Sequence, residues 1–545
     1  MAYHSTETEI RVEKAAAHEV EEKLGADAIF QAKHASDEEH NETFFQTFKN
    51  NRKAVAWSIA ISLSIVMEGY DTILMGNFFG FPEFQKKFGR DYGGDVGWQV
   101  SAPWQTGLNM ASTCGAIIGA VINGYVASRL GYRTVMIYGM AFLNGFIFVV
   151  FFATGAGMLV AGQVLCGLAW GVFATVGPSY ASEVCPTNLR GYMTTYVNLC
   201  WATGQFIAAG VLYACLERTD EWAYRIPFAI QWAWPLPIMI ICYFAPESPY
   251  FLIRNDRIEE ARVSIRRLGG NKTDEQINST LAMMVHTNKI ENDLHAGTSY
   301  FDCFKGTDLR RTEIVCLTFM GQILSGSSFA YSPTYFFTTA GMSDSQAFGM
   351  NLGSTAIAFT GTCLSWFVLT YIGRRRIYLG GMSILCGVQL LIAILDAATS
   401  SSGGLWGQAG LCIIWSLTYS MSIGPIAYCI VSETSSVQLR PLSVVLARNA
   451  YQLVNIVSQI LQSYFMNPTA WNASGKTGFF WGGTAAMILT WAFFRLPECK
   501  GRTYEELDIL FANKVKTRDF RKTHVDAYAG AGQISQEKHE ATMKE

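Results

Sequence analysis

Twelve apolar stretches, each about as long as the hydrocarbon core of a bilayer is thick, dominate this chain. A helix needs about 20 residues to cross that core, and a backbone exposed to lipid must satisfy its hydrogen bonds internally. The sequence therefore predicts an all-α membrane protein with twelve transmembrane helices. They are expected at residues 54–79, 104–126, 134–154, 158–181, 193–215, 226–245, 312–337, 348–371, 377–397, 406–431, 443–465 and 478–496.

The composition fits this interpretation and excludes several classes of function. Half of the residues are hydrophobic and only 15% are charged, which is more apolar than a soluble domain requires. A net charge of -2 gives no electrostatic basis for binding nucleic acid. Neither metal-ligand spacing nor a pairing of nucleophile and base emerges, so we expect no enzyme, no catalytic residues, no metal and no cofactor.

Basic residues in the short loops predict how the chain is oriented. Loops enriched in Lys and Arg face the cytoplasm, and such residues follow the second and eighth spans: Arg129, Arg133, Arg374, Arg375 and Arg376. An even number of spans then places both tails in the cytoplasm. The same topology leaves the loop after the eleventh span outside, where Asn472 begins a glycosylation motif, whereas Asn41, Asn271 and Asn278 should stay unmodified.

The two halves of the sequence repeat the same loop motifs. Three pairs of segments match at nearly one offset: Ser182, Glu183, Leu189 and Arg190 with Ser432, Glu433, Leu439 and Arg440; Pro246 and Glu247 with Pro497 and Glu498; and the turn at Gly131 with the turn at Gly373. Such duplication predicts two six-helix halves related by an axis along the membrane normal, with a binding site near the midplane and rocking as the motion.

The repeats and the charge pattern divide the chain into five parts. We expect a cytoplasmic N-terminal tail (1–53), a first six-helix half (54–245), a cytoplasmic linker (246–311), a second six-helix half (312–496) and a cytoplasmic C-terminal tail (497–545). Within the linker, Ile258, Ala261, Ile265 and Leu268 recur at helical spacing, which predicts a surface helix. That helix either clamps the halves or is an ordinary solvated connection.

Glu68 and Asp71 lie three residues apart in the first apolar stretch and therefore share one helix face. An acid in a transmembrane helix costs about 3 kcal/mol, so such groups usually serve transport or proton movement. The alternative is that both acids are hydrated at a helix end. Arg448 is the conspicuous cation in a late span; it either balances these acids or reaches the membrane interface.

The loop motifs resemble those of the sugar porter family within the major facilitator superfamily. The resemblance covers about residues 54–512 and rests on the two Ser-Glu-to-Arg motifs, PESPYFL at 246–252, GRRR at 373–376 and PECKGRTYEELD at 497–508. EGYDT, CGLAWGVFATVGPSYASEVCP and TTYVNLCWATGQ further resemble fungal α-glucoside permeases of the maltose permease type. The family implies the major facilitator fold and gating roles for the charged loop residues.

The chain also departs from the family pattern. An expected Asp after the second span is Ser128, and Thr370 occupies the matching place in the second half. Many proton-coupled members carry an Arg after Gly162, where this chain has Gln163. A neutral amide cannot serve as the counter-ion of Asp71, so the resemblance to the α-glucoside group indicates a subgroup trait.

The resemblance also implies where a sugar would bind. Amides and hydroxyls recognise ring oxygens, and aromatic faces contact the C–H surface. The candidate sugar-binding residues are Gln163, Asn198, Gln205, Gln322, Tyr428 and Asn455, of which Tyr428 takes the place of a stacking Trp. Each amide could instead make an interhelical hydrogen bond.

Together these features predict proton-coupled uptake of α-glucosides such as maltose across the plasma membrane. A transporter-like sugar sensor is the alternative, although only about 49 residues follow Leu496 and sensors of this kind have long tails. A passive facilitator, or a symporter for a hexose or lactose, is a further alternative. The expected partners are a sugar, protons and the lipid bilayer, and lysines in both tails could accept ubiquitin.

Overall fold

The computed structural model describes residues 44–93, 97–270, 273–295, 299–330, 333–398, 402–435, 439–500, 507, 510–520 and 523. Most of both tails, including most of the lysines considered for ubiquitin, and the sites at Asn41 and Asn271 lie outside the described residues. Contacts divide the chain into two compact units. Unit 1 comprises residues 1–296, 332–359 and 463–472, and unit 2 comprises residues 297–331, 360–462 and 473–545.

Helices form at every predicted span, which confirms the all-α membrane fold. Among the described residues, eleven helical stretches are long and apolar enough to cross a membrane. The remaining predicted span corresponds to α23 (Arg440–Met466), a 27-residue helix. Its arginines and amides make it less apolar than the others.

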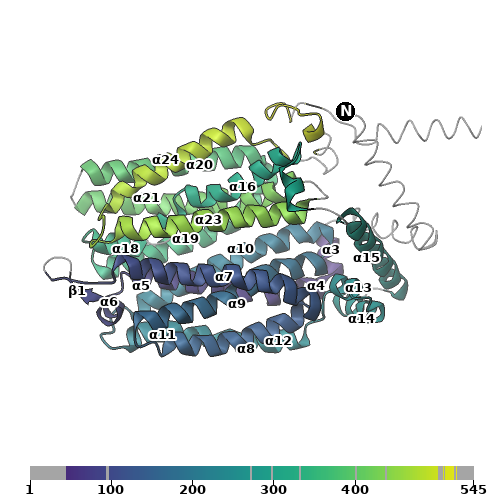
Figure 1. The fold of residues 1–545 in the computed structure, drawn as a ribbon, viewed down its shortest axis with the longest axis horizontal. Helices are drawn as coiled ribbons and strands as arrows, with labels where there is room; N and C mark the ends of the chain where they lie inside the picture. Colours follow the sequence, from purple (N-terminus) through teal and green to yellow (C-terminus); the bar gives the residue numbers. More distant parts are fainter. Residues whose placement is uncertain are drawn as a thin grey trace, which may run out of the picture. The chain divides into compact units, whose positions relative to one another are not determined.

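The first six spans are built from the helices of unit 1 that are shown at the purple and blue end of the colour bar in Figure 1. They are α4 (Arg52–Ser62) with α5 (Ser64–Phe78), α7 (Ala102–Leu130), α8 (Tyr132–Phe151), α9 (Ala156–Val184), α10 (Thr187–Cys215), and α11 (Trp222–Ile230) with η1 (Gln231–Ala233) and α12 (Pro235–Phe244). Between α5 and α7 lie α6 (Pro82–Phe88) and a two-stranded hairpin, β1 (Arg90–Asp91) and β2 (Trp98–Gln99).

Close packing of glycines joins α7 to α9, which run side by side in Figure 1. Gly115 and Gly119 on α7 face Gly167 and Gly171 on α9, and a Cβ on any of the four would overlap the neighbouring backbone. Without a hydrophobic effect between helices in lipid, small residues let van der Waals contacts form at short range. The same device joins α5 to α10, where a Cβ on Gly69 or Gly204 would overlap the facing helix.

The linker is helical, as its periodicity predicts. It contains three surface helices of unit 1 that pack on one another: α13 (Pro249–Arg254), α14 (Ile258–Leu268) and α15 (Asp274–His295). Helix α14 also contacts α4, and α13 contacts α9. Ala261, Ile265 and Leu268 are the buried apolar residues of α14, whereas Ile258 is exposed. The two glutamates of this helix are also exposed, as are Arg266 and Arg267, and Arg262 is half-buried. Further along, unit 1 also includes α18 (Pro333–Thr339), the first part of α19 (Asp344–Tyr371) and the end of α23.

Unit 2 contains the remaining helices, coloured from green to yellow in Figure 1. They are η2 (Tyr300–Phe304), α16 (Asp308–Leu324), α17 (Ser327–Ala330), α20 (Arg374–Ala398), α21 (Ser402–Met421), α22 (Ile423–Thr434), most of α23, η3 (Ser474–Lys476) and α24 (Thr477–Arg495). Helix α20 packs against both α21 and α24. Several spans are interrupted; for example, Gly326 adopts φ 92° between α16 and α17, a value that favours glycine.

Candidate functional site

Asp71 is a carboxylate buried inside unit 1, with only 3% of its surface exposed. Its Oδ1 accepts a hydrogen bond of 2.9 Å from the Gln231 side-chain amide, and its Oδ2 accepts one of 3.2 Å from the Trp170 indole N–H. These donors come from η1 and α9, so three of the first six spans meet at one carboxyl group. Both donors are neutral, and the site holds the acid without neutralising it.

A break in the sixth span positions the Gln231 donor. Pro235 begins α12 and has no N–H, so it cannot bond to the carbonyl four residues earlier, which belongs to Gln231. The chain passes through the 3₁₀ turn η1 at this point. Gln231 is 1% exposed, and its side chain reaches Asp71 across the unit.

Gln163 adjoins the same carboxyl group from α9. It is completely buried, and neither polar atom of its amide has a hydrogen-bond partner within the described part of the chain. An unpaired buried amide is costly. The Oε1 atom of Gln231 also has no hydrogen-bond partner among the described residues. The amides of Gln163 and Gln231 beside Asp71 thus both carry polar atoms that could still form hydrogen bonds.

The other acid and amides predicted in unit 1 lie on helices α5 and α10. Glu68 is half-buried one turn before Asp71. Gln205 is 4% exposed, and its amide nitrogen has no hydrogen-bond partner within the described residues. Asn198 is half-buried two turns earlier on α10. The role of Gln205 in sugar binding stays a prediction.

In unit 2, the side chain of Gln322 already forms a hydrogen bond with the backbone of another helix. Its amide nitrogen donates to the Gly424 carbonyl at 2.9 Å, in the first turn of α22, just after the break at Ser422. Tyr428 is 49% exposed and packs edge-on against Phe319, with ring centroids 5.1 Å apart. Asn455 on α23 is half-buried. Tyr428 is therefore the predicted residue of this unit with the most open aromatic surface.

Arg448 lies on α23 with its guanidinium 4.8 Å from the ring centroid of Tyr451. A cation over an aromatic face is attracted by the ring quadrupole. The predicted pairing of Arg448 with Glu68 or Asp71 stays a prediction.

The loop motif of unit 1 assembles around Glu183 and Glu247. Glu183 accepts from the Tyr132 hydroxyl at 3.0 Å and pairs with Arg254 at 2.8 Å; the Ser248 hydroxyl also donates to it. Glu247 accepts the backbone N–H groups of Tyr132 and Arg133 at 3.1 Å each. Burial raises the pKa of Glu247, and these amide donors oppose the rise.

The motif of unit 2 repeats this geometry, except that an arginine stands where unit 1 has Tyr132. Glu498 accepts the backbone N–H of Arg374 at 2.8 Å, as Glu247 accepts that of Tyr132. The Arg374 guanidinium pairs with Glu433 at 2.8 Å, where unit 1 uses the tyrosine hydroxyl. Arg375 donates to the Phe493 carbonyl at 2.7 Å. The duplicated sequence is thus a duplicated set of contacts within each unit.

The remaining predicted residues take simpler places. The Arg129 guanidinium lies 4.2 Å from the Tyr125 ring centroid. Arg190 and Arg440 belong to α10 and α23, but their side chains lie outside the described residues. Asn472 is exposed in the loop after α23 with φ 46°, the left-handed region that Asn tolerates.

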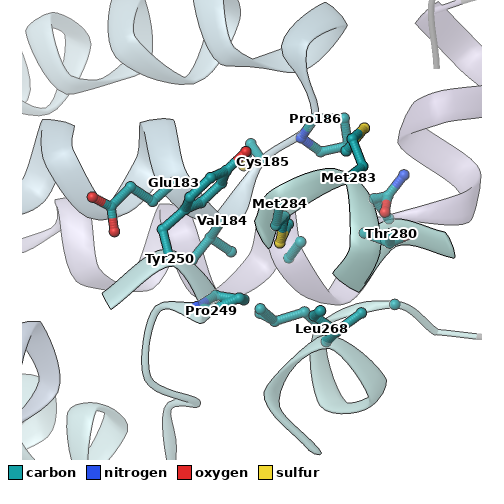
Figure 2. A pocket seen from close by; sticks show the side chains of 14 residues that line it. Glu183, Val184, Cys185, Pro186, Pro249, Tyr250, Leu268, Thr280, Met283 and Met284 are labelled. Atoms are coloured by element: carbon teal, nitrogen blue, oxygen red, sulfur yellow. The ribbon is translucent and has the colours of Figure 1, made fainter. Parts of the chain in front are cut away.

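A small pocket lies beside the linker helices of unit 1 (Figure 2). Its volume is about 60 Å³, which suits a few water molecules but no disaccharide. Figure 2 shows Glu183 at one side and the sulfur atoms of Met283 and Met284 at the other. The pocket is therefore too small to be a sugar-binding site.

Sequence reasoning missed Gln231 and Trp170, the two donors to Asp71. Both lie in other spans, and their contact with the acid arises only through helix packing. Pro235 within an apolar stretch was the available signal for the break that orients Gln231.

A helical membrane fold with duplicated loop contacts and a buried carboxylate in its first span defines a carrier of the major facilitator type. Residues 57–511 match the family described as "Sugar (and other) transporter". The chain belongs to this family of membrane transporters.

Curated relatives and a solved structure agree with this assignment. The chain is 39% identical over 503 residues to a general alpha-glucoside permease of Saccharomyces cerevisiae, covering 91% of this chain and 81% of the relative. It is 37% identical over 511 residues to maltose permease MAL31 of the same species, covering 93% and 83%. The inward-open xylose transporter XylE from E. coli superposes with a TM-score of 0.66 at 19% identity, covering 84% and 99%.

Proposed function

We propose that the protein takes up α-glucosides such as maltose across the plasma membrane together with protons, by alternating access. The observation that carries the proton step is the buried carboxyl of Asp71, held by two neutral donors. The names of the yeast relatives, alpha-glucoside permease and maltose permease, support the sugar class. Sugar and protons are thus the proposed partners of a protein embedded in the lipid bilayer.

The proposed cycle follows from the chemistry of that carboxyl group. When Asp71 binds a proton it becomes neutral, and a neutral group costs less to bury during a change of face than a charge does. Gln231 and Trp170 donate to the ionised form, so they hold the carboxylate until the next proton arrives. A membrane potential of 100 mV contributes about 2.3 kcal/mol for each charge moved.

Uptake of radiolabelled sugars tests the proposal directly. The experiment uses cells lacking their own permeases and compares maltose, trehalose, sucrose, lactose and glucose, each with and without an uncoupler. We expect maltose or another α-glucoside to be accumulated, and the uncoupler to abolish the accumulation. Uptake that the uncoupler does not change would indicate a passive facilitator, and sugar-dependent signalling without uptake would indicate a sensor.

Replacing Gln205 with alanine is expected to raise the KM for sugar roughly ten- to 100-fold, because a hydrogen bond to a ring hydroxyl is lost in a buried site. Concentration-dependent uptake measures the change. Asn144→Ala is the matched control: Asn144 is another amide of unit 1, and its side chain donates to the Met140 carbonyl of its own helix at 3.1 Å. Its contact with the Trp232 indole is made by the backbone carbonyl, which the substitution keeps. Equal effects of the two changes would argue against sugar contact at Gln205.

The proposed topology places both termini in the cytoplasm and Asn472 outside. We expect the gel mobility of the protein to change on glycosidase treatment, and the Asn472→Gln variant to lose that change. Asn278 serves as the internal comparison, since it lies on α15 of the cytoplasmic linker and should carry no glycan. Cleavage of a terminal tag by protease added to intact cells would contradict the orientation.

A further inference from the structure

Four segments of unit 1 meet in a buried cluster of amide and phenol groups. The Val100 carbonyl accepts from the Asn467 side-chain amide at 2.7 Å and from the Gln105 side-chain amide at 3.0 Å. The same Gln105 nitrogen donates to the Tyr335 hydroxyl at 3.0 Å, and that hydroxyl donates to Gln99 at 3.3 Å. We call these five residues the outer cluster.

The outer cluster is buried and packs against an aromatic ring. Val100 and Asn467 are completely buried, and Gln105 and Tyr335 are 1% and 2% exposed. Phe79 packs edge-on against Tyr335, with ring centroids 6.5 Å apart. Burying so many polar groups is tolerable only because they satisfy one another.

The segments that form the outer cluster come from distant parts of the chain. Gln99 and Val100 end the hairpin before α7, and Gln105 lies in the first turn of α7. Tyr335 belongs to α18, and Asn467 follows α23. In the proposed topology, the loops after the first, seventh and eleventh spans all face outward. The cluster therefore holds α18 and the end of α23 against the hairpin and the start of α7, at the outer end of unit 1.

We propose that the outer cluster is a gate that keeps the external side closed, and that Gln105, Tyr335 and Asn467 are the residues that latch it. The proposal rests on alternating access, because sugar arriving from outside requires these segments to separate. Its chemistry suits a gate that must open repeatedly. Water can replace each hydrogen bond when the latch parts, so the net cost per bond is small, whereas a wholly apolar seal would expose its full area to water.

A buried cysteine beside the latch tests the proposal. Phe79→Cys introduces a thiol next to Tyr335, and its labelling by a membrane-impermeant maleimide on intact cells, without sugar, reports opening of the external side. Labelling is measured relative to the parent, which has 13 cysteines of its own. Tyr92→Cys, at a position that is 45% exposed in the hairpin, gives the rate for an accessible thiol.

Weakening the latch should speed this labelling. In the Phe79→Cys background, Tyr335→Phe removes only the hydroxyl, which bonds to Gln105 and Gln99. Asn467→Ala removes a donor to Val100 and also the oxygen that accepts from Thr469. We expect each variant to raise the labelling rate at least roughly fivefold, because each removes more than one buried hydrogen bond. Thr339→Ala is the matched control on α18, because within the described part of the chain its hydroxyl bonds to carbonyls of its own helix, at 2.8 and 3.0 Å. It should leave the rate unchanged.

Rates that stay at the parental value in both latch variants, with normal amounts at the cell surface, would overturn the proposal. If those variants do not reach the surface, the pair Val100→Cys and Asn467→Cys replaces them: oxidation should stop uptake and a reductant should restore it, and continued uptake after the disulfide has formed would equally refute the gate. Labelling needs neither sugar nor a proton gradient, so it separates a failure of the gate from a failure of the proposed proton-coupled uptake.

Discussion

Asp71→Asn is expected to abolish accumulation of sugar against a gradient while leaving downhill movement measurable. Asparagine has nearly the same size and its carbonyl can still accept from Gln231, but it cannot take up a proton. One proton per sugar at 100 mV supports roughly 50-fold accumulation, since about 2.3 kcal/mol is available and about 1.36 kcal/mol corresponds to a factor of ten. The ratio of internal to external labelled maltose at steady state should therefore fall to about one.

Two further variants locate the effect. Glu68→Gln should impair accumulation less, because Glu68 is only half-buried beside Asp71. Gln231→Leu keeps the titratable group and removes one donor to its ionised form, so accumulation should persist with an altered dependence on external pH. If the Asp71→Asn protein still concentrates sugar, the proton is carried elsewhere.

Arg374→Gln is expected to lower the stability of the protein by about 2 kcal/mol, because it leaves Glu433 partly buried without its cation. The measurement is the melting temperature of the detergent-solubilised protein. Adding Glu433→Gln should recover part of the loss, since no unpaired charge then remains.

The matched control for this effect is Arg495→Gln. Arg495 pairs with Glu313, but the two side chains are 44% and 28% exposed, against 21% each for Arg374 and Glu433. An exposed ion pair contributes about 0 to 1 kcal/mol. Equal decreases in melting temperature in the two variants would mean that burial does not make the Arg374–Glu433 pair more stabilising than an exposed pair.

The sequence predicted the architecture well because the bilayer imposes it. Apolar stretches of sufficient length become helices irrespective of detail, and the comparisons confirm the family and fold. Interruptions within the spans were missed, at Leu63, at η1 and after Leu324. A hydropathy average over a whole span does not register one proline or one glycine, although either can break the helix.

The candidate site was predictable in its residue types and unpredictable in its contacts. Glu68 and Asp71 stand out because acids are rare in apolar spans. The donors to Asp71 do not stand out, because an amide and an indole in other spans are common residues whose role depends on packing. Gln322 illustrates the converse: it was predicted from a family position, and its amide bonds to the Gly424 carbonyl. Its role in sugar binding stays a prediction.

Unit 1 has Tyr132 at the position where unit 2 has Arg374. This difference determines how the chain could be divided into separately produced fragments. Glu433 pairs with Arg374, which lies on a transmembrane helix of the same unit. Glu183 pairs instead with Arg254, which lies on α13 beyond the sixth span. A fragment cut at residue 245 would therefore lose Arg254, the cation that pairs with Glu183. A fragment that continues through α15 to His295 would retain the whole contact set.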